Sequence, residues 1–278
     1  LPSRLAGRLY LRLFAGERSP RWGRYRFPAG TRPADAIERL LEGRVETIAV
    51  TIVEGWGIDE IAGAFAAVGL GTVDEWRELS RRCERIADLV PDAPTLEGFL
   101  FPDTYRFAVG LAAPSAAGHM LDRFREVWRA ETTDAAAAGA PLWASPLELV
   151  TLASLVEAET ALPGERPRIA GVFRNRLRLG MLLQCDPTVV YALKRRGEWQ
   201  GRLYRRHWAT DDPYNTYRYP GLPPGPINSP GRASLAAAIR PESHELLYFV
   251  ASPGGGHSFS RTLAEHERAV ARWQASRR

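Results

Sequence analysis

Residues 145–160 read SPLELVTLASLVEAET and carry the strongest helix signal of the chain. Ser145 suits the N-cap position, because its hydroxyl can accept a backbone N–H of the first turn, and Pro146 fits the first helical position. Glu148 stands three residues after the cap, which completes the pattern of a capping box. Apolar residues then recur at helical spacing, so the sequence predicts a helix with one buried face.

Two carboxylates close this helix. Glu157 and Glu159 are two residues apart and therefore cannot share a helix face. At about 100° per residue, Glu159 projects about 60° from the centre of the apolar stripe and Glu157 about 100°. A carboxyl group held against apolar surface keeps its proton near neutral pH, as a general acid must, and Glu159 is the better candidate. The alternative is two solvated glutamates on a surface helix.

The composition suits two modest domains or one large one, with a formal net charge of +5 over 278 residues. Arginine carries nearly all of the positive charge, because Lys194 is the only lysine. A mildly basic protein suits an anionic polymer such as a cell wall, a membrane surface or nucleic acid. The arginines form no extended stripe with interleaved aromatic residues, so nucleic acid is not expected as a partner.

Several kinds of chemistry leave no signature in the sequence. There is no His pair at zinc-ligand spacing, no phosphate-binding loop, no dinucleotide fingerprint and no Gly-x-Ser-x-Gly elbow. Lys194 lies beside two arginines and is a poor candidate for a Schiff base. Cys83 and Cys185 match no metal or redox spacing, so two reduced thiols are expected unless the fold brings them together. We therefore expect no metal and no cofactor.

The rest of the chain predicts an α+β fold of several helices and a few short strands. Three regions are expected: an N-terminal segment over 1–54, a helical connecting region over 55–144 and a catalytic domain over 145–278. The expected helices span 32–42, capped by Thr31, and then 58–65, 73–88, 112–144, 169–180, 186–196 and 229–239, with a last one after Thr262. The expected strands span 24–27, 45–53, 246–250 and 257–259.

The segment 214–219, YNTYRY, offers ring faces and hydrogen-bonding edges. Such surfaces suit sugars, which present apolar faces and many hydroxyl groups. The alternative is that these tyrosines only anchor a long loop. With the other chemistries set aside, carboxylate chemistry on a sugar is the remaining enzymatic interpretation.

Several motifs in a fixed order carry a family resemblance. The chain resembles the endolytic murein transglycosylases, also known as MltG/YceG-like proteins, over most of its length from about residue 45. The matching segments are 97–105 (EGFLFPDTY), 152–160 (LASLVEAET), 165–167 (ERP), 169–177 (IAGVFRNRL), 180–191 (GMLLQCDPTVVY), 214–217 (YNTY), 221–227 (GLPPGPI) and 256–259 (GHSF). Each is weak alone, whereas together they are specific.

The resemblance implies a bacterial enzyme that cleaves the bond between N-acetylmuramic acid and N-acetylglucosamine in nascent peptidoglycan, forms 1,6-anhydro ends and ends strand elongation. It implies a small LysM-like α/β module from about residue 24 to 54, followed by a mixed helical and short-strand catalytic domain. It also implies a single N-terminal helix that anchors the protein in the cytoplasmic (inner) membrane, with the catalytic part in the periplasm or outer cell-wall space. The implied partners are glycan strands and the wall synthases (penicillin-binding proteins).

The family's catalytic glutamate falls on Glu159, in agreement with the helix projection. One carboxyl group suffices for this reaction, whereas a hydrolase needs a second, for which Glu97, Asp103 and Asp186 are candidates. Cys185 departs from the family, where threonine is common. A non-catalytic peptidoglycan-binding or scaffold protein and a muramidase-type hydrolase are the alternatives. The residues expected to bind substrate are Glu97, Glu157, Gln184, Asp186, Thr188, Tyr214, Asn215 and Tyr217.

Overall fold

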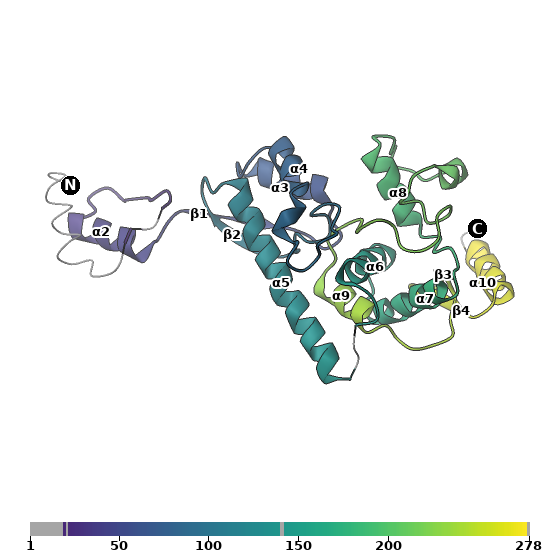
Figure 1. Cartoon of the computed structure of the whole chain (residues 1–278). Helices are drawn as coiled ribbons and strands as arrows, with labels where there is room; N and C mark the ends of the chain where they lie inside the picture. The colour runs from purple at the N-terminus through teal and green to yellow at the C-terminus, as the bar shows by residue number, and fades with distance from the viewer. Residues whose placement is uncertain (1–18, 21, 140–141, 277–278) are drawn as a thin grey trace.

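The structure, a computed structural model, describes residues 19–20, 22–139 and 142–276. It is mostly helical with two separate two-stranded antiparallel sheets, which confirms the α+β class. Two lobes form the main body: the N-terminal lobe covers 47–137 and the C-terminal lobe 146–276. Helix α2 (Pro33–Glu42) lies apart from both, at the end of an extended segment (Figure 1). The first eighteen residues of the predicted N-terminal segment lie outside the described residues.

The N-terminal lobe is built on one strand pair. Its elements are β1 (Thr47–Thr51), α3 (Ile58–Ala67), α4 (Val73–Ser80), the 3-10 turn η1 (Cys83–Arg85), β2 (Thr104–Ala108) and α5 (Ala113–Ala137). β1 and β2 run antiparallel, with Thr47 opposite Ala108, and the segment between them folds back as helices. Phe65, Trp76 and Phe107 pack their rings together inside the lobe. Because β1 pairs with β2, which lies outside the range 24–54, that range does not form a separate domain on its own.

The C-terminal lobe surrounds α6 (Pro146–Glu159). Its other elements are η2 (Pro163–Glu165), α7 (Arg166–Arg178), α8 (Asp186–Arg195), η3 (Arg205–Ala209), α9 (Arg232–Ile239), the antiparallel pair β3 (Tyr248–Ala251) and β4 (His257–Ser260), and α10 (Leu263–Ala275). Helices α7, α8 and α9 all contact α6. Every residue from Leu149 to Val156 is therefore buried, the polar Thr151 and Ser154 included. A single buried face was the wrong expectation, because neighbouring elements cover α6 all round.

Contacts between distant segments hold the lobes together. Glu131 of α5 is 3% exposed and forms ion pairs with Arg232 and Arg240 of the C-terminal lobe. The 94–98 loop also lies against the segment after residue 220. Gly98 has φ +84°, and a side chain there would collide with Pro226, so only glycine permits this approach.

The sequence placed most elements, with errors at their ends. The capping box of α6, with Ser145 and Glu148, is confirmed. The helix expected over 73–88 ends at Ser80, and β2 forms inside a segment expected to be a loop. No strand forms over 24–27. The predicted caps at Thr31 and Ser229 are wrong, since α2 and α9 start after other residues.

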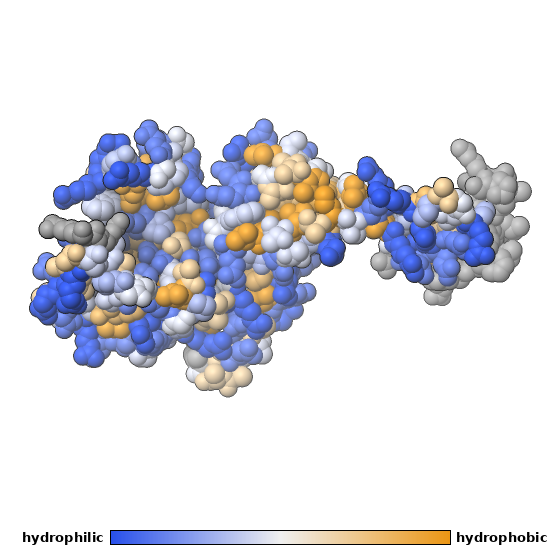
Figure 2. Space-filling model, turned by 180° about the vertical axis from the view of Figure 1, so that it is seen from behind, coloured by the Kyte–Doolittle hydropathy of each residue, from blue (hydrophilic) through white to orange (hydrophobic). Residues whose placement is uncertain are grey.

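The surface and the hydropathy of the helices add two observations. Seen from behind, polar residues cover much of the main body, and apolar residues gather on the N-terminal lobe near the segment that leads to α2 (Figure 2). Within the part of the chain that the structure describes, no helix combines the length and the hydropathy that crossing a bilayer requires.

Candidate active site

Glu159 is the last residue of α6 and faces a cavity of about 360 Å³ in the C-terminal lobe. The cavity brings together segments that are far apart in sequence, namely α6, the 183–186 turn, Tyr217 and the β3–β4 pair. Glu159 thus stands where the apolar helix meets a polar hollow. The residues lining it are Glu159, Arg176, Leu183, Gln184, Asp186, Tyr217, Phe249, Val250, Ala251, His257 and His266.

The surroundings of Glu159 favour its protonated form. Burial raises the pKa of its carboxyl group, and the charge of Asp186 raises it further. A carboxylate at the C-terminal end of a helix also meets the negative end of the helix dipole. Three groups act in the opposite sense. The thiol of Cys185 donates a hydrogen bond to Oε1 over 3.0 Å, and the nearby charges of His257 and Arg176 lower the pKa.

The net pKa of Glu159 lies above its ordinary value. The free site therefore favours the protonated acid more than water does, while the Cys185 thiol, His257 and Arg176 stand where they can stabilise the carboxylate once that proton leaves. This is the balance that a general acid needs if it must later accept a proton as a base.

A second carboxylate orients His257 at the cavity. Glu165 accepts hydrogen bonds from the His257 backbone N–H over 2.8 Å and from the Thr160 hydroxyl over 3.2 Å. Its Oε2 lies 2.7 Å from His257 Nδ1. Burial raises the pKa of Glu165, but the hydrogen bonds from His257 and Thr160 outweigh it and hold the pKa below its ordinary value. Glu165 is thus an anionic partner that fixes the imidazole beside Glu159.

Arg176 fixes the turn that carries Gln184 and Cys185. This buried side chain donates to the carbonyl oxygens of Leu182 and Leu183, over 3.1 and 2.9 Å, and to Gln184 Oε1 over 3.3 Å. Gln184 is the one non-glycine residue in the described chain with a positive φ, 54°. Such a conformation persists where the surrounding structure imposes it, and it often marks a functional site.

Asp186 connects this cavity with a larger one. It is the first residue of α8, and its Oδ1 accepts hydrogen bonds from Tyr217 Oη over 2.7 Å and from Trp208 Nε1 over 3.0 Å. The rings of Trp208 and Tyr217 stack. Asp186 and Tyr217 line the Glu159 cavity, and Asp186 also lines a second cavity of about 730 Å³.

That second cavity contains Glu97 and Tyr214. Glu97 is 5% exposed and accepts the backbone N–H of Ile58 over 3.1 Å, so it holds the start of α3. Burial raises the pKa of Glu97 to about 8. Tyr214 is buried behind Arg195, whose guanidinium lies over its ring. Neither residue lines the Glu159 cavity, and Asp103 lines neither cavity but pairs with Arg123.

Three of the predicted substrate-binding residues lie out of reach of a ligand. Thr188 and Asn215 are fully buried. Thr188 donates to the Cys185 carbonyl oxygen, and the Asn215 amide donates to the carbonyl oxygens of Trp208 and Thr210. Both side chains position the loop rather than contact a ligand.

Glu157 is the third such residue. Its side chain is 6% exposed and forms a 3.1 Å ion pair with Arg166, which is itself buried, and it accepts the backbone N–H of Gly231. The helix projection placed Glu157 farther from apolar surface than Glu159. It misjudged the burial of Glu157, because the neighbouring helices α7 and α9 cover that side as well.

Sequence reasoning assigned no role to His257, Glu165 or Arg176. Each lies inside a motif that carried the family resemblance, GHSF, ERP and IAGVFRNRL respectively. Those motifs were the only sequence signal that could have pointed to the three residues. Nothing local shows that Glu165 and His257 meet, because 92 residues separate them.

Comparison with known proteins shows which family the chain resembles. Residues 2–272 match the YceG-like family. The chain is 31% identical over 260 residues to an endolytic murein transglycosylase of Bacillus subtilis (strain 168), covering 87% of this chain and 69% of that protein. It is 29% identical over 293 residues to an endolytic murein transglycosylase of Streptococcus pneumoniae (strain ATCC BAA-255 / R6), covering 90% of this chain and 50% of that protein. The chain thus spans about half the length of the pneumococcal relative.

A solved structure shares the fold. The crystal structure of a yceG-like protein from Listeria monocytogenes superimposes with a TM-score of 0.67 at 29% sequence identity, covering 96% of this chain and 90% of that one. The chain belongs to the YceG-like family, which confirms the resemblance carried by its motifs.

Proposed function

We propose that this protein is an endolytic murein transglycosylase, a lyase that cleaves peptidoglycan strands internally with Glu159 as its acid. The observation that carries the proposal is a carboxyl group with a raised pKa at the end of a buried helix, in a polar cavity, in a chain of the YceG-like family. The names of the Bacillus and Streptococcus relatives support the same activity.

In the proposed reaction one carboxyl group acts twice. Protonated Glu159 donates its proton to the oxygen that links muramic C1 to the next sugar, and the C1–O bond breaks as that sugar leaves with a hydroxyl group. The C6 hydroxyl of the same muramic residue attacks C1 and gives its proton to the Glu159 carboxylate. The products are a 1,6-anhydro end and a regenerated acid. No water is consumed, and the intramolecular nucleophile benefits from proximity.

The neighbours of Glu159 fit both proton transfers. Burial retains the proton before reaction, and the Cys185 hydrogen bond with the charges of His257 and Arg176 stabilises the carboxylate between the two transfers. Glu165 fixes the position of His257. Gln184 and Tyr217 are proposed to hydrogen-bond the sugars next to the cleaved bond.

A muramidase-type hydrolase remains the second candidate, because Asp186 supplies another carboxyl group to the cavity that holds Glu159. Incubation with purified peptidoglycan, followed by mass spectrometry of the products, separates the interpretations. Anhydro ends establish the lyase, reducing ends establish the hydrolase, and an absence of products leaves a binding protein.

We further infer three properties from the family resemblance. The resemblance implied a LysM-like unit over about 24–54, and we infer that this unit, if present, is the strand–helix–helix–strand segment from β1 to β2, because β1 pairs with β2. The catalytic part acts outside the cytoplasmic membrane, to which an N-terminal helix anchors the protein. Wall synthases are its partners. Cell fractionation and co-purification of the full-length protein with the synthases test the last two.

A further inference from the structure

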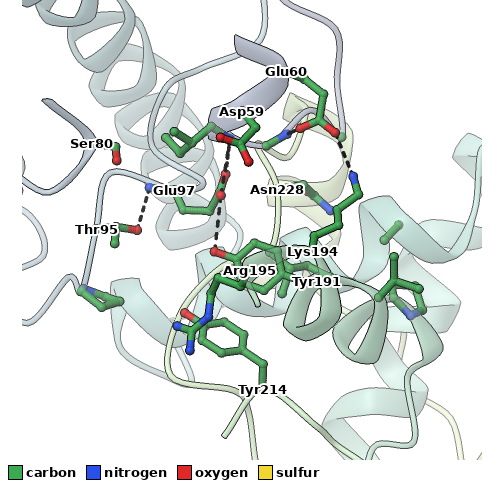
Figure 3. Close-up of a pocket in the computed structure, with 18 of the residues that line it drawn as sticks. Asp59, Glu60, Ser80, Thr95, Glu97, Tyr191, Lys194, Arg195, Tyr214 and Asn228 are labelled. Carbon is green, nitrogen blue, oxygen red and sulfur yellow. Dashed lines mark hydrogen bonds and ion pairs between the residues drawn. The ribbon is translucent and has the colours of Figure 1, made fainter. Parts of the chain in front are cut away.

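The larger cavity, of about 730 Å³, lies between the two lobes and has no role in the proton transfers described above (Figure 3). One wall consists of the start of α3 and the 94–97 loop, and the other is the exposed face of α8. Asp186 lines this cavity and the Glu159 cavity alike, and Ala158 in its wall precedes Glu159 in sequence. A ligand bound across Glu159 can therefore continue into the larger cavity.

Charged groups of opposite sign face each other across this cavity. Asp59 and Glu60 stand on the α3 wall, and Lys194 and Arg195 stand on the α8 wall. Lys194 Nζ and Glu60 Oε1 form a 2.8 Å ion pair that bridges the walls. The four side chains are between 41% and 65% exposed, so solvent and ligands can reach them.

Arg195 keeps hydrogen-bonding capacity for a ligand. Its shortest ion-pair distance to a described residue is 3.6 Å, from Nη2 to Asp212 Oδ2, which is too long for a strong hydrogen bond. The guanidinium is held instead by its position over the Tyr214 ring, 4.9 Å from the centroid. A guanidinium fixed in this way is suited to bidentate binding of a carboxylate.

Two buried polar side chains, Asn228 and Glu97, also line the larger cavity. Asn228 is 5% exposed, and its Oδ1 has no hydrogen-bond partner among the described residues, although its Nδ2 donates to the Ser154 carbonyl oxygen. Glu97 is linked to Tyr191 across the cavity, with 3.4 Å between Oε2 and the hydroxyl. Its raised pKa keeps Glu97 protonated at neutral pH, so a neutral carboxyl group rather than an anion faces the cavity.

We infer that this cavity binds the stem peptide of the muramic residue at the cleavage point, with Arg195 holding a peptide carboxylate. The inference rests on the proposed function. In a peptide-bearing strand the lactyl carboxyl group of the muramic residue is tied up in an amide bond, so the glycan itself is neutral. The carboxylates and the amine of such a strand belong to its stem peptides. A cavity with charged walls matches the peptide. A five-residue peptide reaches about 17 Å when extended, which allows it to run from one cavity into the next.

The test compares peptide-bearing strands with strands stripped of peptide by an amidase, both assayed for anhydro products. We expect the wild-type protein to cleave peptide-bearing strands with the higher kcat/KM. In Arg195→Gln the ratio of the two kcat/KM values falls about tenfold, chiefly through KM, because one charge-assisted hydrogen-bonded contact is lost. Arg196→Gln is the matched control. Arg196 is the next residue, is similarly exposed and pairs with Glu198 outside the cavity, so its ratio stays at the wild-type value.

A binding measurement does not depend on the variants. The synthetic peptide L-Ala–γ-D-Glu–diaminopimelate–D-Ala–D-Ala, titrated into the unmodified protein, should shift the amide NMR signals of Tyr191, Arg195 and Asn228 before those of the Glu159 cavity. Two results overturn the inference: equal cleavage of both kinds of strand, or peptide-induced NMR shifts only at residues outside the larger cavity. Either result leaves the transglycosylase proposal intact. If neither kind of strand yields anhydro ends, it is the proposed function that fails.

Discussion

The thiol of Cys185 lies 3.0 Å from Oε1 of Glu159 and donates a hydrogen bond to it. Burial raises the pKa of Cys185 well above its ordinary value, so the thiol stays protonated and acts only as a donor. The bond favours the Glu159 carboxylate and lowers the pKa of Glu159. A hydroxyl group at this position would be a stronger donor than the thiol. Burial is the largest influence on the pKa of Glu159, and the Cys185 hydrogen bond is the largest of the influences that oppose it.

We predict opposite pH shifts for two Cys185 variants. A general acid must be protonated, so activity falls as the pH rises through its pKa. Cys185→Ala removes the donor, raises the pKa of Glu159 and moves this high-pH limb upward. Cys185→Ser supplies a stronger donor and moves it downward. The dependence of kcat/KM on pH measures both, with Cys83→Ser as the control thiol. Shifts in the same direction for Ala and Ser would contradict this role of Cys185.

Glu159→Gln should lower the rate of anhydro-end formation by at least about a thousandfold, because glutamine keeps the shape of the side chain and loses the titratable proton. The fold should be intact, since Glu159 forms no ion pair with any residue that the structure describes. Product analysis by mass spectrometry and a thermal unfolding curve check both statements. Near-normal turnover would show that another group is the acid.

Glu157→Gln should destabilise the fold instead. It leaves the buried Arg166 with only its longer, 3.9 Å ion pair to Glu54, and breaking a buried ion pair costs about 3 kcal/mol of unfolding free energy. Urea titration measures the loss. Glu126→Gln is the control, because its pair with Arg123 is exposed and worth under about 0.5 kcal/mol. If Glu157→Gln leaves stability unchanged while activity disappears, Glu157 has a catalytic role and our structural assignment is wrong.

Glu97 should make stability fall as the pH rises. Its pKa in the folded protein is about 8 against an ordinary 4.5, so the folded state holds the proton more tightly than the unfolded state does. This stabilisation is complete below pH 4.5 and is lost as the pH approaches about 8. Relative to Glu97→Gln, the wild-type protein should lose on the order of 4 kcal/mol between pH about 5 and about 8.5. Parallel pH profiles for the two proteins would contradict the raised pKa.

His257→Gln should reduce kcat with little change in KM, because His257 acts on Glu159 rather than on ground-state binding. Its charge lowers the pKa of Glu159, so its removal should also move the high-pH limb upward. Glu165→Gln should reproduce part of both effects by releasing the imidazole. A change in KM alone would assign His257 to substrate binding.

The sequence by itself determined where several helices begin and end, and it identified the family. The capping boxes of α6 and α10 form from residues three apart, as with Ser145 and Glu148, so they need no tertiary information. The same holds for the end of α2 at Gly43, which adopts the left-handed conformation that glycine tolerates. The ordered motifs identified the family and pointed to Glu159.

Only the tertiary structure decided which segments and side chains contact one another. Strand β2 owes its existence to pairing with β1, more than fifty residues away, so its own segment looked like a loop. Periodicity showed one apolar face of α6, whereas α7, α8 and α9 bury every side of it, Thr151 and Ser154 included. Because these helices cover Glu157, its side chain is buried in an ion pair with Arg166. Long-range contact also placed Cys185 and His257 around Glu159, because burial and charge act through space and not along the chain.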